Sequence, residues 1–324
     1  MVKRGLVLAL AVACALVVAA CGGDDSSGGG GSGGSAEVTK LKVGVIPIAD
    51  VAPLYVGIKQ GFFKDENLEI EPVLAEGGAA IIPSVLSGDY QFGFSNTTSL
   101  VIAASKKLPV QIIAQGVLGG TGPDDAWDAV VARKGSGIKT PKDLEGKTIA
   151  VNTLNNIGPL TINNAMEKAG ADYTKIKYIE IPFPDMNAAL DAKRVDAAFE
   201  VEPAYSGGKA AGGTPVLHSY EEMAPNMTVA TYFAAKDYIA KNADIVDRFK
   251  RAIEKSLEYS AQHPDDVRKV IGTYTEIPAA VLSKITLPVW KDDLNEPTIQ
   301  QVAELAKKYG YIEEVPSLDE LIRK

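Results

Sequence analysis

The sequence predicts an α/β fold with two lobes, and three observations support this prediction. Short β-rich segments alternate with helical segments, this alternation occurs in two successive series, and residues 237–324 have an almost entirely helical pattern. Roughly 290 residues carry these patterns, which is more than a single hydrophobic core usually holds. We therefore expect two parallel-rich sheets, each flanked by helices, joined by two crossover segments.

The first series lies between residues 41 and 116. Its expected strands are 41–46, 68–75, 91–95 and 109–116. The residues between these strands have helical patterns. A helix between two strands is typical of a parallel sheet, because the helix returns the chain to the edge at which the first strand began.

The second series follows an irregular stretch at 117–127. Its expected strands are 128–133, 147–152, 176–181, 196–201 and 214–217, and a strand at 227–235 is expected to return the chain to the first lobe. The predicted domains are lobe one, residues 37–130 plus 231–324, and lobe two, residues 131–230. Two strand segments, near 128–133 and 228–235, would link them.

The N-terminus has the pattern of an export signal. Lys3 and Arg4 precede an uncharged apolar run from Leu6 to Ala20. As a helix this run would cover about 22 Å, which is short of the ~30 Å hydrocarbon core of a bilayer. A basic start, a short apolar core and small residues at its end predict a signal peptide over residues 1–20.

The end of that segment, Val18-Ala19-Ala20-Cys21, resembles a bacterial lipobox. The resemblance implies cleavage before Cys21 and acylation of its sulfur. The protein would then be extracytoplasmic and anchored by lipid to the bacterial cell membrane. Residues 22–36 are nearly all Gly, Ser and Asp, a composition that stays disordered because it buries too little apolar surface. We interpret residues 21–36 as a lipidated tether.

The composition excludes several classes of partner. The net charge is −8, and Lys and Arg do not cluster with aromatic residues, so nucleic acid is not an expected partner. Beyond the leader no apolar run is long enough to span a membrane. Cys14 lies in the leader and Cys21 would be acylated, so no disulfide is expected. We expect a monomer that carries no cofactor.

Four short stretches carry a family resemblance. They are Ala52 to Gly57 with Gly61-Phe62-Phe63, Gly77-Gly78 with Leu86 to Gly93, Ile138 to Ala150, and Val195 to Ala198 with Glu202-Pro203. In this order they resemble the solute-binding proteins of ABC importers, in the branch that includes sulfonate, taurine, nitrate and thiamine-precursor binders. The resemblance implies a bilobal, type II periplasmic-binding-protein fold that closes on a solute and delivers it to a membrane permease.

The candidate site lies at the turns that follow the strands, because open α/β sheets bind ligands beyond the carboxyl ends of their strands. In lobe one the candidate ligand-binding residues are Asp50, Val51, Ala52, Gly77, Gly78, Ser95, Asn96 and Thr97. Asp50 has an alternative role as a helix cap, and the glycines as a tight turn. The run 95–98 holds more hydrogen-bonding side chains than one cap needs.

Lobe two contributes a second set of candidates. They are Thr153, Asn155, Asn156, Glu200, Glu202 and Tyr205. Residues 152–156 hold more amides than one cap needs. Glu202 precedes Pro203 and is most simply a helix cap. Glu200 either points into the cleft or ends a solvated strand, and Tyr205 is either an apolar wall or a core residue.

Two observations from the sequence favour different classes of solute. No Lys or Arg falls in these turns, so an anion would be held by N–H groups, hydroxyls and amides. Glu200 instead favours a ligand with an amine or a ring N–H. We expect an organic anion such as an aliphatic sulfonate or taurine first, and a thiamine-precursor pyrimidine as the alternative.

Enzymatic function is not expected. The only histidines are His218 and His263, which we place at the surface, and the sequence contains no metal-ligating cluster, nucleophile elbow or phosphate-binding loop. An exported hydrolase that uses Glu200 and Glu202 is the alternative from another class, because paired carboxylates hydrolyse glycosides. An adhesive surface protein is a third class, and it predicts no ligand in the cleft.

Overall fold

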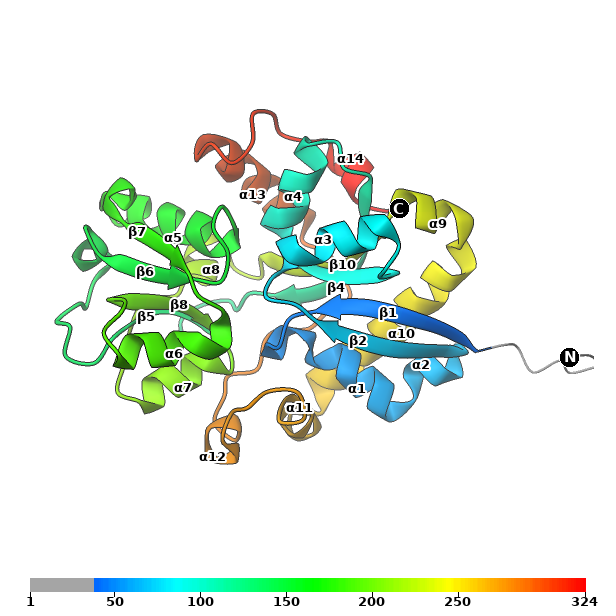
Figure 1. Ribbon diagram of the computed structural model, residues 1–324, viewed down its shortest axis with the longest axis horizontal. Helices are drawn as coiled ribbons and strands as arrows, with labels where there is room; N and C mark the ends of the chain where they lie inside the picture. Colours follow the sequence, from blue (N-terminus) through cyan, green and yellow to red (C-terminus); the bar gives the residue numbers. More distant parts are fainter. Residues whose placement is uncertain (1–37) are drawn as a thin grey trace, which may run out of the picture. The chain divides into compact units, whose positions relative to one another are not determined.

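The computed structural model describes residues 38–324, which contain two five-stranded sheets (Figure 1). The expected signal peptide, the lipidated Cys21 and the tether lie outside the described residues. Within residues 38–324, no helix combines the length and the apolar character that crossing a bilayer requires.

The first sheet has the strand order β2-β1-β3-β10-β4. Its strands are β1 (Thr39–Val45), β2 (Leu68–Leu74), β3 (Phe92–Asn96), β4 (Val110–Leu118) and β10 (Thr228–Ala235). β1 pairs in parallel with β2 and β3, whereas β10 runs antiparallel between β3 and β4. A strand from late in the sequence therefore lies inside a sheet that is otherwise built from residues 39–118.

The second sheet has the order β7-β6-β8-β5-β9. Its strands are β5 (Asp128–Ala132), β6 (Thr148–Val151), β7 (Lys177–Glu180), β8 (Ala197–Val201) and β9 (Thr214–Leu217). β6 pairs in parallel with β7 and β8, and β5 runs antiparallel to β8 and β9. Each sheet therefore has parallel neighbours and one antiparallel strand that follows a crossing between the sheets.

Every strand overlaps a segment that the sequence predicts to be a strand, and the expected α/β class, with two sheets flanked by helices, is confirmed. The predicted lobe boundaries at residues 130 and 231 fall inside β5 and β10. Because each of these strands lies wholly in one sheet, the chain passes between the sheets at residues 119–127 and again at 218–227.

The helices cover both faces of each sheet. Around the first sheet they are η1 (Ala49–Val51), α1 (Ala52–Gln60), α2 (Phe62–Asp65), α3 (Gly78–Ser87), α4 (Thr97–Ser105), α9 (Lys236–Lys241), α10 (Ala243–Gln262), α11 (Pro264–Ile271), α12 (Ala279–Leu282), α13 (Glu296–Lys308) and α14 (Leu318–Leu321). Figure 1 shows α3 and α4 above this sheet and α1 and α2 below it.

The second sheet is covered in the same way. Its helices are η2 (Pro141–Leu144), α5 (Ile157–Lys168), η3 (Tyr173–Lys175), α6 (Phe183–Asp191), α7 (Ala204–Ala210) and α8 (Ser219–Met223). In Figure 1, α5 and α8 lie on one side of the sheet and α6 and α7 on the other.

The core of the first sheet depends on the alternation of side chains along β3. Phe92 faces α10, where its ring stacks on Phe249 with centroids 4.0 Å apart. Gly93 faces the opposite side, toward Ile81 of α3. A Cβ atom at Gly93 would lie 2.5 Å from side-chain atoms of both Ile81 and Phe233, so only glycine lets the helix approach the sheet this closely.

The variant Gly93→Ala tests this packing. We expect its free energy of unfolding to fall by about 1–3 kcal/mol, because the added methyl group overpacks a fully buried contact. Gly122→Ala is the matched control, since a Cβ there meets nothing within 4 Å, and its free energy of unfolding should change by less than about 0.5 kcal/mol. Urea denaturation measures both, and equal effects in the two variants would contradict the packing argument.

Candidate functional site

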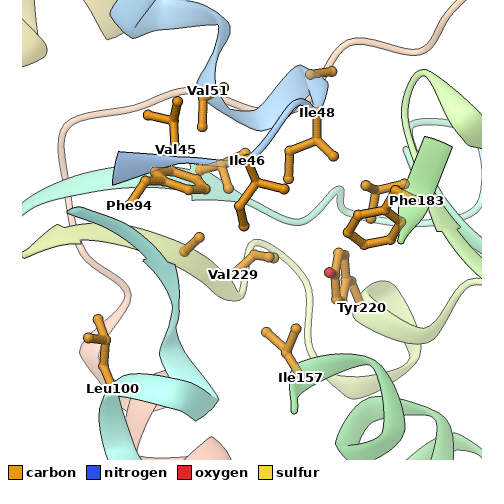
Figure 2. Close-up of a cluster of buried hydrophobic side chains, with 14 of the residues drawn as sticks. Val45, Ile46, Ile48, Val51, Phe94, Leu100, Ile157, Phe183, Tyr220 and Val229 are labelled. Atoms are coloured by element: carbon orange, nitrogen blue, oxygen red, sulfur yellow. The ribbon is translucent and has the colours of Figure 1, made fainter. Parts of the chain in front are cut away.

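A small buried cavity lies where turns of the two sheets meet, and we call it the inner cavity. It measures about 30 Å³ and is lined by Ile46, Ile48, Asp50, Phe94, Asn96, Asn152, Asn156, Ile157, Phe183, Phe199, Val201, Tyr220, Val229 and Ala230. Figure 2 shows Ile46, Ile48, Phe183 and Tyr220 pointing toward the same space. Both sheets contribute to the walls, which are mostly apolar and aromatic.

A larger cavity of about 460 Å³ adjoins it, and we call it the outer cavity. The two cavities share Ile48, Phe183 and Val201 as lining residues. The inner cavity has room for a water molecule but for no organic solute, whereas the outer cavity has the size of an ordinary ligand pocket. A solute therefore reaches the inner polar groups only when the walls move apart.

Asp50 supplies the only ionisable carboxyl group in the lining of the inner cavity. Its residue is 3% exposed, and its Oδ1 atom has no hydrogen-bond partner. Burial raises the pKa of Asp50 to about 8. Its side chain does not cap α1, since Val51 occupies the cap position without a side-chain hydrogen bond. The carboxyl group is therefore free to interact with a ligand.

Two asparagines of the lining cap helices from opposite sides of the cavity. Asn96 Oδ1 accepts from the N–H of Ser99 at 2.9 Å, at the start of α4. Asn156 Oδ1 accepts from the N–H of Ile157, at the start of α5. Asn156 Nδ2 also donates to Ser99 Oγ at 3.3 Å, so the two helix starts are joined directly. These amides are held in place by the helices they cap.

The lining of both cavities contains no Lys, Arg or His. The inner cavity instead presents one carboxyl group, the amides of Asn96, Asn152 and Asn156, and the rings of four aromatic residues. Flat aromatic walls with a few convergent polar groups are typical of sites for small, planar organic ligands.

The remaining candidates of lobe one build the turns and do not line the inner cavity. Val51 and Ala52 are fully buried in the core. A Cβ at Gly77 would lie 2.7 Å from Thr153 Oγ1, and one at Gly78 only 2.2 Å from Ser95 Oγ. Both glycines therefore permit close packing. Thr97 Oγ1 donates to the carbonyl of Thr228 at 3.2 Å, which ties α4 to β10.

Glu200 points away from the inner cavity. Its neighbours Phe199 and Val201 line the cavity, and successive side chains of a strand face opposite sides of the sheet. Glu200 instead faces α7, where a Cβ at Gly208 would lie 2.5 Å from Glu200 Oε2. Both of its carboxylate oxygens are buried without a partner, and burial raises the pKa of Glu200 well above its usual value.

Glu202 precedes α7, and its carboxylate binds groups in the first turn of that helix. Its carboxylate accepts from the N–H of Ser206 at 3.2 Å, from Ser206 Oγ at 2.7 Å and from the N–H of Thr286 at 3.1 Å. Burial raises the pKa of Glu202 to about 6. Neither Glu202 nor Glu200 lines either cavity, so the carboxylate pair expected of a hydrolase does not form at this site.

The other candidates of lobe two also lie outside the inner cavity. Thr153 lies directly against Gly77 of lobe one. Asn155 is exposed, with a positive φ of 47°. The centre of the Tyr205 ring lies 5.9 Å from that of the His218 ring. Lys209 Nζ lies over the Tyr205 ring, 4.2 Å from its centre.

Several lining residues were not found from the sequence. They are Asn152, Ile157, Phe183, Phe199 and Tyr220. Asn152 lies in the stretch 152–156, which the sequence analysis noted for its many amides. Its position directly after β6 could have identified it as a candidate for the site. The aromatic residues come from α6, β8 and α8, and their apolar character is equally compatible with core packing.

Comparison with known proteins identifies a family. The sequence profile described as "NMT1/THI5 like" matches residues 48–267. The formylaminopyrimidine-binding protein of Halalkalibacterium halodurans is 23% identical over 78% of this chain and 70% of its own length. The taurine-binding periplasmic protein of Escherichia coli is 27% identical over 63% of this chain and 61% of its own length.

Two fungal relatives, each 23% identical, are named as 4-amino-5-hydroxymethyl-2-methylpyrimidine phosphate synthase. They come from Aspergillus parasiticus and Candida albicans.

Solved structures share the fold. The periplasmic aliphatic sulphonate binding protein SsuA of Escherichia coli has a TM-score of 0.70 at 19% identity, covering 87% of this chain and 96% of its own. The periplasmic nitrate-binding protein NrtA of Synechocystis has a TM-score of 0.76 at 12% identity, covering 89% and 86%. The expected periplasmic-binding-protein fold is thereby confirmed.

The variant Asp50→Asn tests the buried carboxyl group through the pH dependence of stability. An Asp in an unfolded chain titrates near pH 4, whereas the pKa of Asp50 in the fold is about 8. Between these values the folded protein keeps a proton that the unfolded chain releases, so stability falls as pH rises, by up to about 1.4 kcal/mol per pH unit from this group. In the Asp50→Asn variant, the free energy of unfolding should lack this contribution to the pH dependence. The variant should therefore be more stable than the wild type near pH 8.

Urea denaturation between about pH 5 and about pH 8 measures these slopes. Asp124→Asn, at an exposed position, is the control and should keep the slope of the wild type. If Asp50→Asn also kept that slope, the carboxyl group of Asp50 would titrate normally and the account of its burial would be wrong.

Proposed function

This chain belongs to the NMT1/THI5-like family, and on that premise we propose that it is the extracytoplasmic solute-binding component of an ABC importer. The observation that carries the proposal is the inner cavity, where capped turns of both sheets converge on one buried carboxyl group. Named relatives that bind solutes, such as the taurine-binding and formylaminopyrimidine-binding proteins, support the same role.

The geometry supports a cycle of opening and closing. The walls of the inner cavity come from both sheets, so a solute that contacts both walls stabilises the form in which they are close together. The hydrogen bond from Asn156 to Ser99 and that from the N–H of Ala49 to the carbonyl of Glu202, 2.9 Å long, join the two sides. Opening breaks these bonds and exposes the site to the outer cavity.

The solute that fits this site best is a small, planar nitrogen heterocycle with an exocyclic amino group. When protonated, the Asp50 carboxyl group offers one donor and one acceptor, and when ionised it offers two acceptors. An amino group beside an unprotonated ring nitrogen matches the protonated carboxyl group, and one beside a protonated ring nitrogen matches the carboxylate, in each case with two parallel hydrogen bonds. The rings of Phe94, Phe183, Phe199 and Tyr220 provide apolar surfaces on which such a heterocycle packs.

The anion that the sequence favours first fits less well. An anion needs cationic groups or free N–H groups at helix starts, and neither cavity is lined by Lys, Arg or His. At the starts of α4 and α5, the N–H groups of Ser99 and Ile157 are already occupied by the caps Asn96 and Asn156. Above about pH 8, where Asp50 is ionised, its carboxylate would also repel an anion. We therefore place the pyrimidine type of solute ahead of sulfonates and taurine.

We also propose that Cys21 anchors the protein by lipid to the cell membrane. The export pattern of residues 1–20 and the Gly/Ser-rich stretch at 22–36 support this proposal. A coil of that length reaches about 20 Å on average. It would hold the binding domain close to an ABC permease in the same membrane.

A binding experiment with matched solutes tests the proposal. We expect an aminopyrimidine to bind and to stabilise the protein by about 2.7 kcal/mol at 100 times its Kd, without any product formed. For a solute with a protonated ring nitrogen, Asp50→Asn should weaken this binding by roughly 10–100-fold, because the amide cannot pair with the charged ring as a carboxylate does and a hydrogen bond to a charged group contributes about 1.5–3 kcal/mol. Calorimetric titration measures the affinity, and Asp124→Asn serves as the control.

Taurine, an alkanesulfonate and nitrate complete the series. If an anion bound most tightly, and Asp50→Asn strengthened its binding by removing a repulsive charge, the proposed solute class would be wrong while the binding role stood. If no solute bound and the aminopyrimidine were instead converted to a product, the importer role itself would be wrong.

A further inference from the structure

Three potential metal ligands meet at a place that the proposed function does not use. One ligand atom from each of Asp128, His218 and Glu221 can be chosen so that all lie within 4.8 Å of one another. Asp128 is fully buried, while His218 and Glu221 are half-buried. The sequence predicts no metal site, because Asp128 and His218 are 90 positions apart and meet only through the fold.

The hydrogen bonds at this cluster leave one atom free on each residue. Asp128 Oδ2 accepts from the N–H and the Oγ of Ser219, at 3.1 and 3.0 Å, and Asp128 Oδ1 has no partner. Glu221 Oε1 accepts from the N–H of Gly120 at 2.7 Å, and Glu221 Oε2 is buried without a partner. His218 Nδ1 lies 2.6 Å from the carbonyl oxygen of Asp128, which leaves Nε2 with a free lone pair.

This bonding pattern is the one that orients ligands in metal sites. A metal-bound histidine usually donates its second ring N–H to a carbonyl or a carboxylate, which fixes its tautomer. Ligand carboxylates are likewise held by hydrogen bonds through their second oxygen. Here His218 is held by the Asp128 carbonyl, Asp128 by Ser219, and Ser219 in turn by Thr161 Oγ1 at 2.9 Å.

The charges at the cluster lack a cationic partner. Asp128 and Glu221 each contribute a carboxylate oxygen to the group of atoms that lie within 4.8 Å of one another. None of the ion pairs among residues 38–324 includes Asp128 or Glu221. Two carboxyl groups this close are stabilised either by a shared proton or by a cation between them.

The cluster also lies between the two crossings of the chain. Asp128 follows the first crossing and begins β5, and Gly120 lies within that crossing. His218 and Glu221 begin the second crossing, which leads to β10. The crossings are paired by the hydrogen bond from the N–H of Gly119 to the carbonyl of Met227, 2.9 Å long. A ligand here would tie both connections between the sheets.

We propose that Asp128, His218 and Glu221 form a binding site for one divalent transition-metal ion, with Zn²⁺ as the favoured ion, at the junction of the two crossings. The imidazole favours such an ion over Ca²⁺ and Mg²⁺, which take oxygen ligands. Zn²⁺ accepts one nitrogen and two carboxylate oxygens and fills its fourth position with water. The ion would neutralise the two carboxylates and stabilise the junction.

Zinc titration of the full chain, followed by calorimetry and by metal analysis after gel filtration, tests the site. Cys14→Ser and Cys21→Ser are included throughout so that thiolates do not compete for the ion. We expect one Zn²⁺ per chain. His218→Asn keeps an N–H donor for the Asp128 carbonyl but removes Nε2, and Glu221→Gln replaces Oε2 by an amide that can donate to Asp128. Each should weaken zinc binding by about 100-fold or more, since loss of an outer-shell partner alone costs 10–100-fold.

His263→Asn and Glu222→Gln are the matched controls, because both residues are exposed and lie outside the cluster. They should bind zinc as the parent does. Circular dichroism should show all variants folded, since both ligand variants preserve a hydrogen bond of the cluster. If the parent binds no zinc, or if His218→Asn or Glu221→Gln binds it unchanged, the proposal is overturned and the two carboxyl groups share a proton.

Discussion

An ionised carboxylate loses several kcal/mol of hydration in a protein interior unless a cation or several donors replace the water. Asp50, Asp128, Glu200 and Glu202 are all buried here, and none of the ion pairs that the structure shows between residues 38 and 324 includes any of them. Glu202 is satisfied by three donors, whereas Asp50 and Glu200 keep unpartnered oxygens. The interior therefore favours protons, cations and N–H donors, and this one preference underlies both the proposed selectivity of the inner cavity and the proposed metal site at the crossings.

The fold was predictable because its strands are short, β-rich and separated by Gly, Pro and polar residues. Each sheet also contains a strand that follows a crossing, and both were expected as strands, at 128–133 and 228–235, although they were expected to link the lobes themselves. The positions of the boundaries were less predictable, since a strand that follows a crossing has the same local pattern as any other strand. Whether β10 pairs with the first or the second sheet depends on contacts between residues far apart in the sequence.

The site was predictable at the level of turns but not of single side chains. Asn96 and Asn156 were found because polar residues follow strands, and both line the inner cavity as caps of facing helices. Glu200 lies on the opposite face of β8 because its neighbours Phe199 and Val201 face the cavity. The sequence shows that successive side chains of this strand point to opposite faces. Only tertiary packing decides that α7 covers one face and that the other face meets the first sheet.

The two sheets differ in the length of chain that each needs. The second is made from one continuous stretch, residues 128–217, whereas the first is completed by β10 and by the last residues, where the N–H of Arg323 bonds to the carbonyl of Ile112. During synthesis from the N-terminus, the second sheet therefore has all its strands before the first does. A nascent chain that stops before residue 228 exposes unpaired edges of β3 and β4, and such edges associate readily with other chains.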